Sequence, residues 1–280
     1  MSVKTFVLTA LAMLAFAGNS LLCRAALRDS EIDPATFTTL RLLAGAFMLW
    51  VLHTLRHKFS GSKGTWPGAA ALFVYATAFS YAYLHIDAGA GALLLFGAVQ
   101  LSMIVWGLFK GERLQRLQVT GLLLASAGLL ALLLPGTSAP AASASVLMII
   151  SGVAWGGYSL LGRGVSDPLA ATAGNFIRTI PMAVALSVLT LAWLEWDTAG
   201  VVYAVLSGAL TSGIGYAIWY AALPGLAAVQ AASVQLSVPL LTALAGSLLL
   251  GETLTGRLLL AGAAILGGIA LVMCVKHRAR

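Results

Sequence analysis

The chain has 280 residues, of which 60% are hydrophobic and 9% charged, and it carries a formal net charge of +7 at pH 7. Soluble domains average about 45 to 50% apolar and about 25% charged residues. The composition therefore excludes an ordinary soluble domain and predicts a polytopic membrane protein surrounded by the lipid bilayer. In such a chain the excess of lysine and arginine indicates which loops face the cytoplasm, so nucleic acid is not expected as a partner.

Ten apolar stretches are long enough to cross about 30 Å of hydrocarbon, which takes roughly 17 to 25 residues. Turn-forming pairs separate them, among them Asp33-Pro34 and Pro224-Gly225. The expected fold is an all-α membrane protein with ten transmembrane helices. In chain order the spans lie near 5–22, 34–54, 67–84, 88–108, 117–134, 144–162, 168–193, 199–221, 226–248 and 257–275.

The sequence of residues 15–24 returns, with changes, at residues 154–163. The first copy reads Ala-Phe-Ala-Gly-Asn-Ser-Leu-Leu-Cys-Arg, and the second reads Ala-Trp-Gly-Gly-Tyr-Ser-Leu-Leu-Gly-Arg. The element Gly-Glu-x-Leu at 111–114 likewise returns at 251–254. We therefore expect two five-helix repeats, residues 1–138 and 139–280.

Basic residues determine the expected orientation. With the amino terminus in the cytoplasm, eleven basic residues fall inside, whereas only Arg24, Arg28 and Arg257 fall outside. The positive-inside rule thus predicts that both termini are cytoplasmic. Because each repeat holds five helices, the second copy enters the bilayer from the opposite face. Inverted repeats are the arrangement through which one site opens alternately to either side.

These features resemble the drug/metabolite transporter superfamily, in particular its EamA-type members. The resemblance covers essentially the whole chain. It rests on the two Gly-Glu-x-Leu elements, on Asp-Pro at 33–34 and 167–168, and on Arg41 and Arg178 in the spans that follow. It implies a multi-pass transporter of the bacterial inner membrane that moves small molecules.

Within that superfamily, two spans are most similar to the bacterial aromatic amino-acid exporters. They carry Ala-Trp-Gly-Gly-Tyr at 154–158 and Tyr-Ala-Ile-Trp at 216–219. The resemblance implies amino acids and related small metabolites as substrates. The chain departs from those exporters at Val99, which stands where the repeat would place a counterpart of Pro239. Leu94, Leu95 and Phe96 also replace the polar and aromatic residues of those exporters.

Aromatic and polar side chains inside the spans are the candidates for a substrate cavity. Tyr216 and Trp219 share one helix face, and Tyr75, Phe79 and Tyr83 follow one another at four-residue spacing. A buried Tyr or Trp needs a partner for its polar hydrogen, which a ligand can supply, whereas near a helix end interfacial anchoring is the alternative. The candidates are Phe16, Asn19, Tyr75, Phe79, Tyr83, Gln100, Trp155, Tyr158, Tyr216, Trp219, Gln235 and Pro239.

Two of these candidates, Pro239 and Gln100, also have a structural interpretation. Pro239 cannot donate a backbone hydrogen bond, so it leaves the carbonyl of Gln235 free to meet a substrate, or simply kinks the helix. Gln100 lies deep in its span, where its amide can instead bond a neighbouring helix. The repeat also places Phe16 and Asn19 opposite Trp155 and Tyr158, so the two copies share a scaffold and differ in chemistry.

Charged residues within or beside the spans are expected to be structural. Arg41 lies about two turns inside its span, from which it can snorkel outward or pair with Asp33 or Asp87. Structural pairing is likewise expected for Arg178. Glu112 and Glu252 stand before the fifth and tenth spans, where an acid complements the helix dipole.

None of the nine acids lies in the middle of a span, where a proton relay needs one. We therefore predict uncoupled export of aromatic or neutral amino acids through a central cavity, by a monomer without metal or cofactor. Proton-coupled efflux of other small molecules or drugs is the alternative, and a non-transporting membrane interaction protein is a third hypothesis. The chain contains neither His-Glu-x-x-His nor Gly-x-x-x-x-Gly-Lys-Ser/Thr, so an enzyme or ATP-driven pump is not expected.

Overall fold

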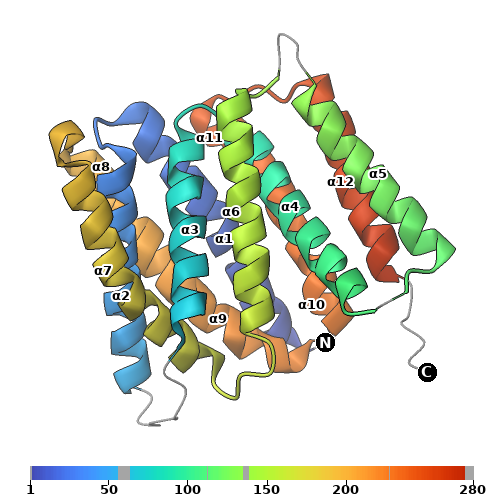
Figure 1. Ribbon diagram of the computed structural model, residues 1–280, viewed down its shortest axis with the longest axis horizontal. Helices are drawn as coiled ribbons and strands as arrows, with labels where there is room; N and C mark the ends of the chain where they lie inside the picture. Colours follow the sequence, from blue (N-terminus) through green and yellow to red (C-terminus); the bar gives the residue numbers. More distant parts are fainter. Residues whose placement is uncertain (1, 56–63, 112, 135–138, 227, 275–280) are drawn as a thin grey trace.

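A computed structural model describes residues 2–55, 64–111, 113–134, 139–226 and 228–274. This part of the chain is a bundle of helices without strands (Figure 1). The elements of the first repeat are α1 (Val3–Asp29), α2 (Pro34–Leu55), α3 (Trp66–Tyr83), α4 (Ala88–Phe109) and α5 (Arg116–Leu133). Those of the second are α6 (Ala142–Leu161), α7 (Pro168–Leu189), η1 (Leu191–Trp193), α8 (Thr198–Val205), η2 (Leu206–Ile214), α9 (Gly215–Ala222), η3 (Leu223–Gly225), α10 (Ala228–Gln235), α11 (Ser237–Leu250) and α12 (Gly256–Cys274).

The Asp-Pro pairs start two of the helices. Asp33 Oδ1 accepts hydrogen bonds of 2.9 Å from the backbone N–H groups of Ala35 and Thr36, and Asp167 accepts one of 3.1 Å from Ala170. The proline that follows each aspartate takes the first helical position, where its missing N–H would have had no partner in the helix. The repeated motif is therefore a pair of helix N-caps.

The Gly-Glu-x-Leu elements end helices. Gly111 after α4 and Gly251 after α11 have φ angles of 87° and 65°, a left-handed conformation that favours glycine at a helix C-terminus. The expectation that Glu252 caps the tenth transmembrane helix is wrong, because α12 begins only at Gly256. Glu252 Oε2 instead accepts the Ala88 N–H at 2.8 Å, so it caps α4. Glu112 lies outside the described residues.

Nine helical segments of the described chain are long and apolar enough to cross a membrane. The remaining long helix, α3, has 18 residues and carries more tyrosine and small side chains. It lies among α2, α6 and α7, and thus has protein rather than lipid around most of its surface. Together these segments form the expected ten-helix polytopic membrane fold.

The two repeats interlock through equivalent pairs of helices. In the first repeat, α1 packs against η2, α9 and α11; in the second, α6 packs against the corresponding α3 and α4. Likewise α2 packs against α8 and η2, and α7 against α3. Figure 1 shows that α1 rises from the face where the chain begins while α6 runs the opposite way, so the repeats are inverted. Below, the N-terminal face is the face at which α1 begins, and the distal face is the other one.

Two transmembrane segments of the second repeat are irregular where they reach the centre. The eighth segment is α-helical in α8 and α9 but π-helical across η2. The ninth breaks at Leu236, between α10 and α11, three residues before Pro239. Short π-helical segments occur most often at functional sites, and broken helices at membrane depth line cavities or find protein partners.

Candidate functional site

A cavity of about 40 Å³ lies in the centre of the molecule, where α1, α3, α4, α6, η2, α9 and α10 meet. Both repeats contribute to its wall. The volume is that of about one water molecule, whereas small-molecule pockets measure roughly 300 to 1,000 Å³. Helices must therefore move apart before a metabolite can fit. The lining residues are Phe16, Asn19, Ser20, Tyr75, Phe79, Leu95, Phe96, Val99, Trp155, Thr211, Ser212, Tyr216 and Gln235.

Aromatic rings from four helices make one side of the cavity. Trp155 of α6 stacks on Tyr216 of α9, with ring centroids 5.6 Å apart and an interplanar angle of 18°. Tyr75 of α3 lies 4.7 Å from Trp155, and Phe16 of α1 lies 5.8 Å from Tyr216. Such a box binds a planar or aromatic side chain by stacking and a cation through the ring faces.

Asn19 is the polar centre of the site. Its Oδ1 accepts hydrogen bonds from the hydroxyls of Ser207 at 2.7 Å and Thr211 at 3.3 Å, and its Nδ2 donates to the Tyr75 hydroxyl at 3.4 Å. The residue is 7% exposed, so these partners replace water. Ser207 and Thr211 are four residues apart in η2 and present both hydroxyls to the same amide. Sequence reasoning missed Thr211 and its neighbour Ser212, although a run of Ser, Thr and Gly inside an apolar span was a usable signal.

Seven of the twelve residues predicted from the sequence line the cavity: Phe16, Asn19, Tyr75, Phe79, Trp155, Tyr216 and Gln235. Tyr158 and Trp219 lie in the layer behind, stacked on Trp155 at 5.3 Å and edge-on to Phe16 at 6.1 Å. The other three predicted residues, Tyr83, Gln100 and Pro239, do not line it.

Tyr83 and Gln235 show that a polar side chain inside a transmembrane span need not be free to bind a substrate. Tyr83 is fully buried, and its hydroxyl donates to the Ala88 carbonyl at 3.4 Å beside the distal face. Gln235 lines the cavity, but its side-chain amide donates to the Ala231 carbonyl at 3.2 Å within α10. A substrate would have to compete with that bond for the amide group.

Arg41 does not make the ion pair expected from the sequence. Asp33 caps α2 and also accepts the Glu195 N–H at 3.2 Å, and Asp87 pairs with Arg24. The Arg41 guanidinium instead lies over the ring of Phe79 at 5.1 Å. Arg178 donates to the Gly174 carbonyl at 3.0 Å, a bond within its own helix.

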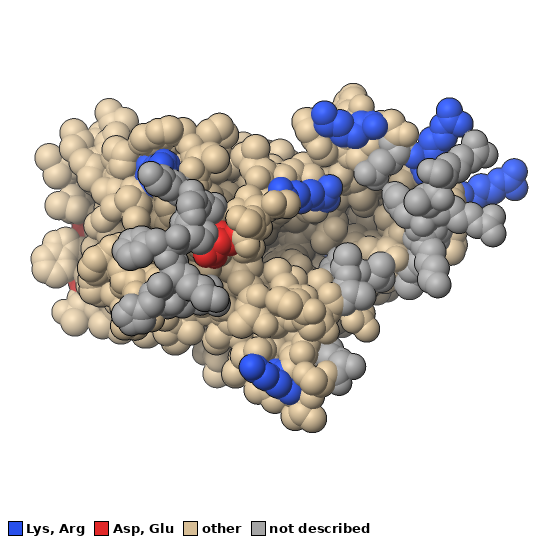
Figure 2. Space-filling model, turned by 90° about the horizontal axis from the view of Figure 1, so that it is seen from below, with Lys and Arg blue, Asp and Glu red and all other residues tan. Residues whose placement is uncertain are grey.

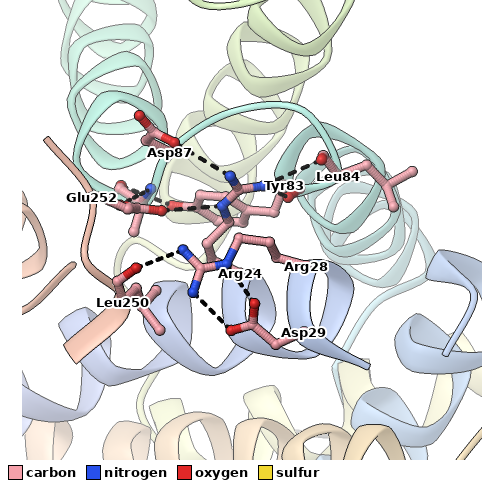
Figure 3. A network of polar contacts seen from close by, with 9 residues as sticks. Arg24, Arg28, Asp29, Tyr83, Leu84, Asp87, Leu250 and Glu252 are labelled. Carbon is pink, nitrogen blue, oxygen red and sulfur yellow. Dashed lines mark hydrogen bonds and ion pairs between the residues drawn. The ribbon is translucent and has the colours of Figure 1, made fainter. Parts of the chain in front are cut away.

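A polar network lies between the central cavity and the distal face (Figure 3). Arg24 donates from Nε to Glu252 at 3.1 Å and from Nη2 to Asp87 at 3.3 Å, and we call these three residues the Arg24 network. Arg24 Nη1 also donates to the carbonyls of Tyr83 at 2.8 Å and Leu84 at 3.2 Å. The network thus ties the end of α1 to the α3–α4 turn and the loop after α11.

The groups of this network are shielded from water to different degrees. The side chains of Arg24 and Glu252 are 11% and 7% exposed, whereas Asp87 is 51% exposed. Burial raises the pKa of Glu252 above its usual range, although the hydrogen bond from Arg24 acts in the opposite direction. One turn further along α1, Arg28 forms a separate, more exposed pair with Asp29 at 2.6 Å.

A larger cavity of about 640 Å³ lies nearer the N-terminal face, between α1 and α10–α11. Phe6, Thr9, Ala10 and Met13 line it from α1, on the same side of the helix that carries Phe16 and Asn19 to the central cavity. Its wall contains no charged side chain and few polar groups that converge on one point. We therefore place the specific site at the smaller central cavity, where aromatic and polar groups of both repeats meet.

Comparison with known proteins identifies relatives along the whole chain. A model of the EamA-like transporter family matches residues 3–134 and again residues 142–274. An uncharacterized protein of Pseudomonas aeruginosa is 60% identical over 274 residues, which cover 98% of this chain and 96% of that protein. An uncharacterized transporter of Archaeoglobus fulgidus is 27% identical over 99% of this chain and 100% of its own length.

Two more distant similarities concern substrate and fold. A probable terminal-alkyne amino-acid exporter of Streptantibioticus cattleyicolor is 25% identical over 216 residues, which cover 75% of this chain and 71% of that protein. A crystal structure of a protein superposes with a TM-score of 0.65 at 19% identity, over 96% of this chain and 95% of the other. The latter similarity concerns the fold alone.

Proposed function

Because the chain belongs to the EamA-like transporter family, whose members are transporters and not enzymes, we propose that it exports aromatic and neutral amino acids, with related small metabolites, by alternating access. The observation that carries the substrate class is the central cavity, where Trp155, Tyr216 and Asn19 converge from both repeats. A stacking surface beside hydrogen-bonding groups suits a molecule that has an apolar side chain at one end and polar groups at the other. The amino-acid exporter among the relatives supports the same class.

The N-terminal face is the cytoplasmic one in this proposal, and the membrane is the bacterial inner membrane. Among the described residues, this face carries five basic side chains, Lys4, Lys110, Arg113, Arg116 and Arg163, and one acid, Asp167. Figure 2, which views the molecule from that side, shows basic groups spread around it. The distal face carries most of the acids, so the positive-inside rule supports this orientation.

The Arg24 network is the outer closure of the pathway. It links α1, the start of α4 and the loop after α11, and of these α1 and α4 line the central cavity. A substrate cannot leave toward the outside while these elements are held together. Export therefore requires that Arg24 release Glu252 or Asp87, and the present structure is closed at this end.

The larger cavity is the inner approach. It follows the same faces of α1 and α10–α11 from the central cavity toward the cytoplasmic side. Its apolar wall lets an amino-acid side chain pass without specific binding. Alternating access then consists of opening the central cavity first to this side and, after the Arg24 network breaks, to the other.

Movement down the substrate gradient is the coupling mode we propose. The described acids lie in loops or at helix ends, and Glu112 lies between the fourth and fifth helices in the sequence. Several of them are engaged in caps or ion pairs: Asp33, Asp167 and Asp197 cap helices, and Asp29, Asp87 and Glu252 pair with arginine. Proton-driven efflux of other small molecules is the competing function, and it requires an ionisable relay along the pathway.

Flux measurements on purified protein in liposomes test both statements. Labelled phenylalanine, tryptophan and leucine should equilibrate across the membrane with or without a pH gradient. Trp155→Ala should reduce the rate by at least about tenfold, because it removes the ring on which Tyr75, Tyr158 and Tyr216 stack. Trp50→Ala is the matched control, since Trp50 is 51% exposed on the lipid-facing side of α2.

Each outcome bears on one part of the proposal. Absence of flux for every amino acid would overturn the substrate class. Flux that appears only with an imposed pH gradient would replace the uncoupled mechanism by proton coupling. Equal effects of the two tryptophan substitutions would remove Trp155 from the site.

A further inference from the structure

Arg41 is a buried cation that forms no ion pair with the residues that the structure describes. It lies on α2, it is 3% exposed, and its Nη1 has no hydrogen-bond partner in the described part of the chain. The ion pairs of the described residues join Arg24 to Asp87, Arg24 to Glu252 and Arg28 to Asp29. None of them involves Arg41, so its charge is not neutralised by a carboxylate there.

The surroundings of Arg41 belong to the central cavity. Its guanidinium lies 5.1 Å from the ring centre of Phe79 and 5.8 Å from that of Tyr75, and both rings line the cavity. Arg41 itself is absent from the cavity wall, whereas the two rings that its guanidinium contacts are part of that wall.

Two aromatic rings offset only part of the cost of keeping an arginine out of water. A charged side chain inside the bilayer is expensive, and such residues normally pair with an acid or mark a substrate pathway. The two acids expected from the sequence as partners of Arg41 are engaged elsewhere: Asp33 at the start of α2 and Asp87 on Arg24. An anion from outside the protein would supply the missing partner.

We propose that Arg41 binds the carboxylate of the transported molecule. When the central cavity widens, the rings of Tyr75 and Phe79 move aside and the guanidinium donates two parallel N–H bonds to the carboxylate oxygens. The planar fork of arginine fits a carboxylate in this way, and lysine does not. The side chain of the substrate then lies against Trp155 and Tyr216. The inference rests on the proposed function only for the identity of the substrate as an amino acid.

Binding measurements test the anion site without any transport. Thermal unfolding of the detergent-purified protein is followed against rising phenylacetate and, separately, phenylacetamide, which has the same ring and no charge. Phenylacetate should bind at least about tenfold more tightly, because only it makes charge-assisted bonds to Arg41. Arg41→Gln should abolish the difference, Arg41→Lys should retain part of it, and Arg116→Gln, an exposed position at the start of α5, should leave it intact.

Transport provides the second readout. Liposomes containing the wild-type protein should take up phenylalanine at least about tenfold faster than phenylalaninamide at equal concentration. Equal uptake of the two, or equal binding of phenylacetate and phenylacetamide, would overturn the proposal even if Arg41→Gln failed to fold. Selective binding of phenylacetate without flux of any amino acid would support the anion site and overturn the proposed substrate, so the two failures are distinguishable.

Discussion

The outer closure can be tested by removing the charge of Glu252 while keeping its shape. In Glu252→Gln the single amide oxygen can accept only one of the two hydrogen bonds that the carboxylate now accepts on separate oxygens, from Arg24 Nε on Oε1 at 3.1 Å and from the Ala88 N–H on Oε2 at 2.8 Å. The amide NH2 group is a donor and faces the other N–H. A hydrogen bond to a charged group contributes about 1.5 to 3 kcal/mol. Losing one such bond therefore costs the closed state about 2 kcal/mol, or roughly 30-fold in the ratio of open to closed molecules.

The change is measured as the reactivity of a cysteine placed in the central cavity. Ser20 lines that cavity and is 2% exposed, so Ser20→Cys reports access from outside. Native Cys23 and Cys274 are replaced by serine in this background. A membrane-impermeant maleimide, added to the outside of intact cells, should then label position 20 roughly 30-fold faster in Glu252→Gln, in proportion to the open fraction.

The Arg28–Asp29 pair supplies the control. It lies one turn beyond Arg24 on the same helix, but its side chains are 31% and 45% exposed. Exposed ion pairs contribute about 0 to 1 kcal/mol, so Asp29→Asn, which leaves the hydrogen bond from Arg28 to the Leu250 carbonyl in place, should change the labelling rate by less than about fivefold. If Glu252→Gln left the rate unchanged, or if Asp29→Asn raised it equally, the Arg24 network would not be the closure.

A further prediction follows from the packing of η2. For η2, a Cβ at Gly208 would overlap the Arg41 carbonyl oxygen, whereas one at Gly157 meets nothing within 4 Å. Gly208→Ala should therefore lower the thermal unfolding temperature in detergent, at a cost of about 1 to 3 kcal/mol, and Gly157→Ala should not; equal unfolding temperatures would contradict this account of η2 packing.

The helices themselves were predictable because apolar length and turn chemistry are local properties. The first span illustrates where that reasoning stops. It was expected to end near residue 22, before Arg24, yet α1 continues to Asp29. A hydropathy argument ends a span at a charge because lipid cannot solvate it. Here the charge of Arg24 is balanced by Asp87 and Glu252, which the sequence places 63 and 228 residues away.

The composition of the cavity was predictable in its aromatic part and less so in its polar part. Spacing along each helix was enough to identify Tyr75, Trp155 and Tyr216 as candidates, since each lies on the inward face of a regular stretch of helix. Thr211 was missed because a threonine inside an apolar span commonly bonds its own helix backbone, as Thr211 does to the Ser207 carbonyl, and the sequence does not show that the same hydroxyl reaches Asn19. Arg41 was misjudged because distance along the chain does not tell which cation an acid will take.

The two copies of the repeated decapeptide end in arginines that have different environments. Arg24 is 9% exposed and held by the Arg24 network at the distal face, whereas its counterpart Arg163 is exposed at the N-terminal face. In an inverted repeat the pseudo-twofold axis relates these two positions. In a symmetric molecule, therefore, both arginines or neither of them would be bound in such a network. The difference matches a molecule closed at one end, with its larger cavity toward the other. Alternating access requires such an asymmetry, because transport proceeds when the two halves exchange conformations around a site that both of them line.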